Sequence, residues 1–142
     1  MPPGPYDIAV IGAGIIGLST ARFIAKDFPH LKVIVLDKET KIAQHQTGHN
    51  SGVIHSGIYY KPGSQKAQFC VAGVRSLVQF CEERDIPYRK CGKVIVATDH
   101  SELDALDAIY EKGTTNGVQG LEVIGPEKLR ELEPYSAGIK AI

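Results

Sequence analysis

The sequence predicts an α/β fold, and the order of features in its N-terminal quarter supports that prediction. A short apolar run, Ile8 to Ile11, leads into a turn with three glycines in G-x-G-x-x-G spacing, Gly12, Gly14 and Gly17. A helical pattern follows, and a second apolar run, Val33 to Leu36, ends on Asp37. Strand, glycine turn, helix, strand and acid in this order are typical of a Rossmann-like βαβ unit that binds a dinucleotide.

Each residue of this turn has a physical task. Gly12 allows the turn that leaves the strand, Gly14 lets a pyrophosphate approach the backbone, and Gly17 lets the helix pack close to the sheet. The phosphates are expected at the helix N-terminus, beside Ile15, where free N–H groups and the helix dipole favour negative charge. The Asp37 carboxylate can accept hydrogen bonds from ribose hydroxyls. The next residue, Lys38, lies either near that ribose or in an exposed loop, and the βαβ unit alone leaves NAD and FAD open.

The predicted elements follow from periodicity and from turn residues. The first helix has a broad apolar stripe, which suits a helix lying on a sheet, and the second strand is almost continuously branched and apolar, which suits a covered parallel strand. Ser64 is a good N-cap for the next long helix. We expect strands at 6–11, 32–37 and 121–124, helices at 14–27, 64–84, 101–112 and 126–132, and a hairpin of 88–90 with 93–98.

Composition limits the classes of protein. The chain has 142 residues, 43% of them hydrophobic, and a formal net charge of zero, which fits one ordinary domain or a fragment of a larger protein. Balanced charge offers no basic patch for nucleic acid, and no apolar run approaches a membrane span of about 18 residues. The start of the chain leaves no room for a signal peptide, so we expect a cytoplasmic protein. Three cysteines without C-x-x-C spacing, Cys70, Cys81 and Cys91, are expected to be free thiols.

The segment from Lys38 to Ser64 is irregular and rich in Gly, His, Ser, Thr and Asn, but it keeps apolar and aromatic residues. Long irregular loops are usually functional or disordered, and disordered segments lack such anchors, so we interpret this one as an ordered ligand-contacting segment. A soft domain boundary is expected near residues 85–87. Residues 1–85 would form the N-terminal part of the nucleotide-binding domain, and residues 86–142 would begin a second domain.

This segment carries a resemblance to a known family. Residues 46–60, QTGHNSGVIHSGIYY, continue into Lys61-Pro62-Gly63-Ser64, and Glu131-Leu132-Glu133-Pro134 follows near the end. Together with the glycine turn, they resemble the FAD-dependent oxidoreductases of the D-amino-acid-oxidase type, and within these the L-2-hydroxyglutarate dehydrogenase/oxidase family. The resemblance implies FAD as the cofactor and residues 86–142 as the start of a substrate-binding domain. Proteins of this family are about three times as long, so we expect a fragment.

The resemblance also implies a reaction and its residues. A 2-hydroxy dicarboxylate, L-2-hydroxyglutarate, would be oxidised to 2-oxoglutarate by hydride transfer to flavin, with oxygen or a quinone as the electron acceptor. Residues of the central loop would surround the FAD, and a histidine near the flavin would act as general base, although hydrogen-bonded packing is the plainer role. The loop residues are Thr47, Gly48, Asn50, Ser51 and Gly52, and the candidate bases are His55 and His49. No metal is expected, because the histidines lack a carboxylate or cysteine set.

A dicarboxylate substrate needs cationic partners, and the sequence offers Lys61, Lys66, Arg89 and Lys93, with surface solvation as the plainer role of each lysine. Arg89 could bind a carboxylate in a bidentate manner, and Tyr60 could shape the pocket. Surface solvation and aromatic packing are the alternatives for these two side chains. The full-length protein would associate peripherally with a membrane. Two other functions stay open, namely a related FAD-dependent amine or glycerol-3-phosphate oxidoreductase and a non-catalytic dinucleotide-binding fragment.

Overall fold

The computed structural model describes residues 4–142, and its contacts divide the chain between Val53 and Ile54 into two compact units. We call residues up to Val53 the first unit and residues from Ile54 the second unit. This division follows contacts alone. The functional boundary expected near residue 85 stays a prediction.

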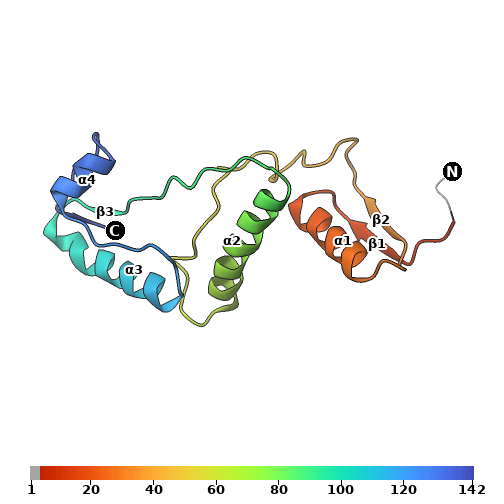
Figure 1. The fold of residues 1–142 in the computed structure, drawn as a ribbon, viewed down its shortest axis with the longest axis horizontal. Coiled ribbons are helices and arrows are strands. Elements are labelled where there is room, and N and C mark those ends of the chain that lie inside the picture. The colour runs from red at the N-terminus through yellow and green to blue at the C-terminus, as the bar shows by residue number, and fades with distance from the viewer. Residues whose placement is uncertain (1–3) are drawn as a thin grey trace. The chain divides into compact units, whose positions relative to one another are not determined.

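The first unit is a βαβ unit, as the sequence predicts (Figure 1). Strand β1 (Ile8–Ile11) pairs in parallel with β2 (Val33–Leu36), and helix α1 (Ile15–Asp27) connects them and contacts both. Both strands are shorter than predicted at their starts. The reason is local, because the Asp7 carboxylate accepts the hydrogen bond from the Lys32 N–H at 2.8 Å and the regular ladder begins only beyond that residue.

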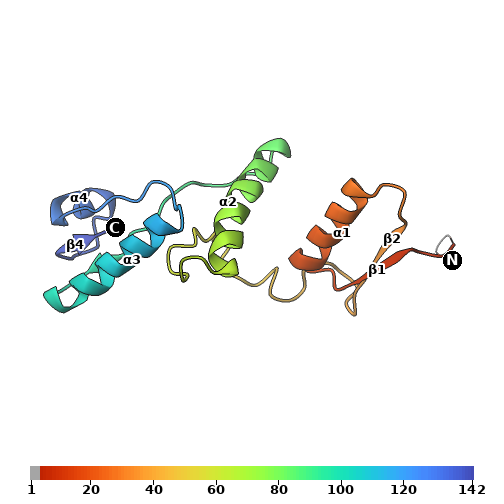
Figure 2. The same cartoon turned by 90° about the horizontal axis from the view of Figure 1, so that it is seen from below.

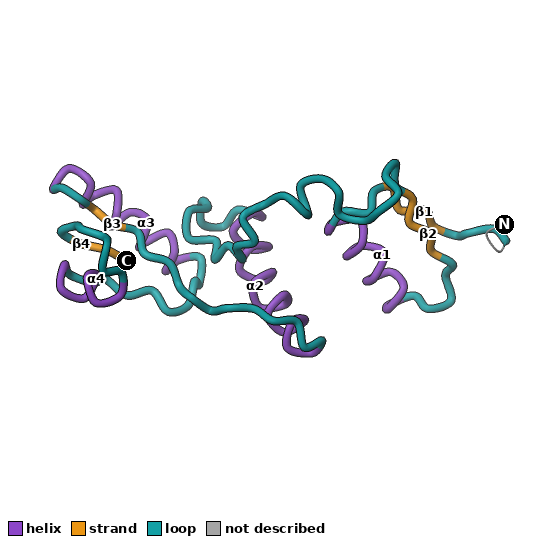
Figure 3. The backbone as a smooth tube through the Cα atoms, turned by 90° about the horizontal axis from the view of Figure 1, so that it is seen from above, coloured by secondary structure: helices purple, strands orange, loops and turns teal. Residues whose placement is uncertain are grey.

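The segment after β2 has no helix or strand until residue 64, in agreement with the prediction of a long irregular loop (Figure 3). It is nevertheless hydrogen-bonded. The Ala43 N–H donates to the Ala13 carbonyl at 3.0 Å, and the Gly48 N–H donates to the His45 carbonyl at 3.0 Å. The first of these bonds holds the start of the loop to the glycine turn, so the part of the loop up to Val53 is an ordered part of the first unit.

The first helix of the second unit is the long helix α2 (Gln65–Glu83). The predicted N-cap is confirmed, because the Ser64 hydroxyl accepts a hydrogen bond from the Ala67 N–H at 3.2 Å. At the other end, Asp85 adopts a left-handed conformation with φ 52°, and the Ile86 N–H turns back to the Cys81 carbonyl at 2.9 Å. This reversal satisfies a carbonyl of the last turn and ends the helix.

The rest of the second unit is a two-stranded antiparallel sheet between two helices (Figures 2 and 3). Strand β3 (Val96–Ala97) pairs with β4 (Lys140–Ala141), and the helices are α3 (Leu103–Thr115) and α4 (Pro126–Leu132). A 3₁₀ turn, η1 (His100–Glu102), precedes α3. Side chains alternate along 94–97, so that Ile95 and Ala97 pack with α3 while Val94 and Val96 pack with α4.

Two sequence predictions in this region are wrong. The expected hairpin of 88–90 with 93–98 does not form, because β3 pairs with β4 instead. The expected strand at 121–124 is reduced to a single bridge between Ile124 and Ala141. A strand does form within 93–98, but its partner lies more than 40 residues away, and local turn chemistry gives no indication of such a partner. No helix in the described residues is long and apolar enough to cross a membrane.

Candidate functional site

The glycine turn between β1 and α1 has a geometry that only glycine tolerates. Gly12 has φ 105°, a region that side chains rarely adopt, and a Cβ built there would meet nothing within 4 Å. Gly17 lies so close to the turn that its Cβ would stand 1.9 Å from the Gly12 carbonyl oxygen. Gly12 therefore leaves open space beside the turn, and Gly17 allows the first turn of the helix to lie against the Gly12 carbonyl.

The N-terminus of α1 presents unpaired N–H groups. The Ala13 N–H donates to the Asp37 carboxylate at 2.5 Å, and the Ile15 N–H donates to the Thr47 hydroxyl at 2.9 Å. Within residues 4–142, no protein group accepts a hydrogen bond from the N–H groups of residues 14, 16 and 17. The first turn also has no acidic side chain to neutralise the positive end of the helix dipole. These free donors fit a phosphate or pyrophosphate.

The Asp37 carboxylate closes this arrangement at the end of β2. One oxygen accepts from the Ala13 N–H, and the other accepts from the Glu39 N–H at 2.8 Å. These two backbone hydrogen bonds, the first being the stronger influence, hold the pKa of Asp37 below its usual range. The carboxylate is therefore ionised at neutral pH. Each oxygen keeps a second lone pair with which to accept a hydrogen bond from a ribose hydroxyl.

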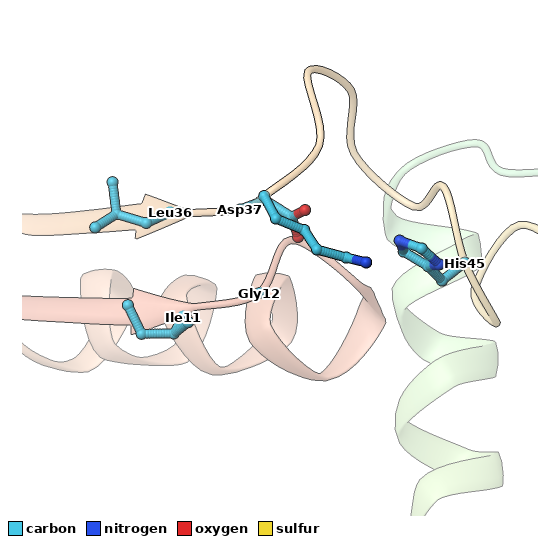
Figure 4. Close-up of a pocket in the computed structure, with 6 residues that line it drawn as sticks. Ile11, Gly12, Leu36, Asp37 and His45 are labelled. Atoms are coloured by element: carbon cyan, nitrogen blue, oxygen red, sulfur yellow. The ribbon is translucent and has the colours of Figure 1, made fainter.

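A cavity of about 350 Å³ opens at the carboxyl ends of the two parallel strands (Figure 4). The ends of parallel strands are where α/β proteins bind ligands. The lining is mixed, with apolar side chains from the strand ends and polar side chains from the following loop. The residues are Ile11, Gly12, Leu36, Asp37, Lys38 and His45.

His45 lines the cavity although the sequence did not predict it as a site residue, and the same is true of Ile11 and Leu36 at the strand ends. Figure 4 shows its ring across the cavity from the end of β2. Its Nε2 lies 3.0 Å from the Glu39 carboxylate, which also contacts the Lys38 ammonium at 3.5 Å. No spacing or motif marks this position, because the irregular loop alone determines where His45 lies.

Of the loop residues predicted to surround the cofactor, Thr47 contacts the N-terminus of α1, whereas the hydrogen bonds of Asn50 and Gly52 and the close contact of Gly48 lie within the loop itself. Thr47 lies against the helix N-terminus, and its hydroxyl would be 3.2 Å from a Cβ at Gly14. Asn50 is used within the loop, because its amide donates to two carbonyls, of Gln46 and Thr47, and its oxygen accepts from the Gly52 N–H at 2.7 Å. Gly48 packs closely on the Ala43 carbonyl, Gly52 has φ 64°, and Ser51 is exposed. Contact of these residues with a cofactor stays a prediction.

His49 lies in the first unit with a defined orientation. Its Nδ1 is 3.0 Å from the His45 carbonyl oxygen, which can only accept a hydrogen bond. Nδ1 therefore carries a proton, and in the neutral ring the lone pair is on Nε2. This tautomer leaves Nε2 able to take a proton from a hydroxyl group.

The other predicted site residues lie in the second unit. His55 is exposed, and its carbonyl accepts a hydrogen bond from the Cys70 thiol at 3.0 Å. The loop after His55 is held by Asn116, whose amide donates to the Gly57 carbonyl at 3.1 Å and to the Tyr60 carbonyl at 2.9 Å. Tyr60 is half-buried with the Lys66 ammonium 5.9 Å from its ring, whereas Arg89 is exposed.

No group of three or more His, Cys, Asp or Glu side chains within residues 4–142 could hold a metal ion. The three cysteines are free, as expected, and only Cys81 is buried.

Three comparisons with known proteins now bear on this site. Residues 7–142 match the family described as FAD dependent oxidoreductase. L-2-hydroxyglutarate dehydrogenase, mitochondrial, of Homo sapiens is 51% identical over 96% of this chain and 30% of its own length. L-2-hydroxyglutarate dehydrogenase of Indibacter alkaliphilus is 48% identical over 96% of this chain and 34% of its own length. The chain thus spans about a third of the curated relatives that it matches.

A solved structure agrees with the fold. FAD-bound, dithionite-reduced L-alpha-glycerophosphate oxidase from Mycoplasma pneumoniae superposes with a TM-score of 0.77 at 26% identity, over 96% of this chain and 36% of that chain. The predicted α/β class and the predicted cofactor are confirmed by the family and by this structure. With its glycine turn, free helix N–H groups and ionised Asp37, the chain belongs to the family of FAD dependent oxidoreductases.

Proposed function

We propose that the protein of which this chain is part oxidises L-2-hydroxyglutarate to 2-oxoglutarate with FAD. One observation supports this above all, namely identity of about half to several L-2-hydroxyglutarate dehydrogenases over 96% of the chain. These relatives are about three times as long. The activity is therefore proposed for the complete protein, to which this chain contributes the first part of the cofactor site.

The first unit would hold the ADP portion of FAD. The free N–H groups at 14, 16 and 17 would bind the pyrophosphate, with Gly12 leaving room for its approach. The Asp37 carboxylate would accept ribose hydroxyls, and Lys38 and His45 would line the same cavity. Thr47, Gly48, Asn50, Ser51 and Gly52 would shape the adjoining wall. When bound, FAD supplies the acceptor for the hydride that leaves the substrate Cα.

A base must take the hydroxyl proton of the substrate, and His49 and His55 are the two candidates. The orientation of His49 favours it, because Nδ1 is already committed to the His45 carbonyl and Nε2 is left as the acceptor. His55 directly precedes the loop that Asn116 holds, and its carbonyl accepts a hydrogen bond from the Cys70 thiol.

The substrate is a small 2-hydroxy dicarboxylate, and Arg89 and Tyr60 are the predicted substrate contacts. Arg89 is exposed and has no ion pair within residues 4–142, so its guanidinium is available to a carboxylate. The electron acceptor would be oxygen or a quinone. We place the protein in the cytoplasm, peripheral on the inner membrane, although several relatives are described as mitochondrial.

Anaerobic reduction of the bound flavin tests this function. L-2-hydroxyglutarate should bleach the oxidised-flavin absorbance of the complete protein, while D-2-hydroxyglutarate, glycerol 3-phosphate and glutamate should not. His49→Gln and His55→Gln should each be measured against pH, because loss of the true base removes the acidic limb of the rate profile. Bleaching by none of these compounds would contradict the proposal.

A related activity is the second candidate. The similarity to L-alpha-glycerophosphate oxidase favours oxidation of glycerol 3-phosphate, and bleaching by that compound alone would support it. Bound FAD that no hydroxy acid, amine or glycerol 3-phosphate bleaches would support a non-catalytic dinucleotide-binding protein.

A further inference from the structure

Lys93 and Tyr59 contact each other in the second unit, and the proposed function gives neither side chain a role. The Lys93 Nζ lies 2.7 Å from the Tyr59 hydroxyl oxygen and 4.5 Å from the centroid of the same ring. An ammonium can only donate, so the Tyr59 oxygen is the acceptor. The hydroxyl hydrogen of Tyr59 and two hydrogens of the Lys93 ammonium are then left to donate to another group.

Both residues extend from fixed backbone. Before Tyr59, Ile58 is only 6% exposed and lies so close to α3 that a Cβ at Gly113 would be 2.8 Å from its Cγ1. On the two sides of Tyr59, the carbonyls of Gly57 and Tyr60 are held by the Asn116 amide. Directly after Lys93, the chain enters the segment that packs between α3 and α4. The two donors are therefore pre-positioned, which reduces the entropy lost when a ligand binds.

The charge of Lys93 is not compensated by a carboxylate. Within residues 4–142, Lys38, Lys128 and Lys140 form ion pairs with acidic side chains, whereas Lys93 forms none and its ammonium contacts the Tyr59 hydroxyl. The Tyr59 side chain also stays accessible, at 49% exposure for the residue. An accessible cation beside a hydroxyl donor is the arrangement that a carboxylate binds with its two oxygens.

We propose that Lys93 and Tyr59 form a carboxylate-binding pair that holds one carboxylate of the substrate. This inference depends on the proposed function, since it assumes a 2-hydroxy dicarboxylate. The Lys93 ammonium donates to one carboxylate oxygen and the Tyr59 hydroxyl donates to the other. A dicarboxylate needs two such partners, and the pair supplies one in addition to the predicted Arg89.

The test measures binding without turnover. Glutarate, which lacks the oxidisable hydroxyl, is titrated calorimetrically into the complete FAD-loaded protein and its variants. Lys93→Gln should weaken glutarate binding about tenfold, as expected for loss of a charged hydrogen bond, and Tyr59→Phe should weaken it a few-fold. Lys90→Gln is the matched control, because it removes the same charge from an exposed lysine three residues earlier and should leave the Kd unchanged.

The outcomes separate the pair from the proposed function. Equal glutarate affinity in Lys93→Gln and Lys90→Gln, or no glutarate binding by the unmodified protein, would overturn the pair. Lys93-dependent glutarate binding without oxidation of L-2-hydroxyglutarate would support the pair and refute the proposed function. Oxidation of L-2-hydroxyglutarate together with a glutarate Kd that Lys93→Gln does not change would support the proposed function and refute the pair. Flavin content and circular dichroism of each variant show whether it is folded.

Discussion

Replacing Gly17 by alanine should damage the first unit, although the same change stabilises most helices. Alanine at an interior helix position gains about 0.5–1 kcal/mol over glycine. At Gly17, however, the new Cβ would lie 1.9 Å from the Gly12 carbonyl oxygen, whereas real Cβ contacts stay beyond 3.0 Å. The obstacle is a backbone oxygen, which no rotamer change can move. The turn must therefore shift, and overpacking of this kind costs about 1–3 kcal/mol.

Gly73→Ala is the matched control for this experiment. Gly73 lies inside α2, and a Cβ there would meet nothing within 4 Å, so only the helix-propensity gain remains. Urea unfolding followed by circular dichroism should show Gly17→Ala less stable than the unmodified chain by about 1–2 kcal/mol, and Gly73→Ala more stable by about 0.5–1 kcal/mol.

FAD binding gives a second measurement of the same change. Moving the Gly12 carbonyl also moves the free N–H groups at the start of α1, so Gly17→Ala should lower FAD affinity more than tenfold while Gly73→Ala leaves it unchanged. If Gly17→Ala were as stable as Gly73→Ala and bound FAD normally, the close approach of α1 to the turn would be wrong.

Two further predictions concern single polar side chains. Asp37 has a lowered pKa in the folded chain, so its contribution to stability is complete above its unfolded pKa of about 3.9 and is lost as the pH falls from there through the folded value. Asp37→Asn should therefore flatten the acid limb of a stability curve measured between pH 6 and pH 2 by urea unfolding, and an unchanged limb would contradict this. Asn116→Ala leaves the Tyr60 carbonyl without its donor and the Gly57 carbonyl with only the Tyr60 N–H, and it should cost about 1–3 kcal/mol. Gln119→Ala, which removes an exposed hydrogen bond to Gly117, is its control and should change the unfolding free energy by less than about 0.5 kcal/mol.

The sequence pattern correctly predicted the elements that depend only on residues close together in the chain. The order of strand, glycine turn and helix requires only neighbouring residues, and Ser64 marks the start of α2 through its own hydroxyl. The hairpin prediction failed because β3 finds its partner in β4, far along the chain. No composition or turn residue encodes such a pairing, which is determined by which apolar faces meet in three dimensions.

In the candidate site, too, residues within a short motif could be predicted, whereas contacts between distant or irregular segments could not. Gly12, Gly17 and Asp37 could be identified from spacing, because a dinucleotide requires those residue types at those intervals. The position of His45 in the cavity and the contact between Lys93 and Tyr59 could not be predicted, because irregular segments bring these residues into place and no sequence period describes an irregular segment.

The pairing of β4 also has a consequence for biosynthesis. Ala141 is completely buried and belongs to the core under α4, while its neighbour Ile142 belongs to the core under α3. Both clusters therefore lack a buried residue until the ribosome has made residues 140–142, and the same short segment completes both of them. During that interval Leu106 and Leu129 lack the C-terminal residues that cover them in the folded chain, so this stretch is prone to aggregation until β4 has been made.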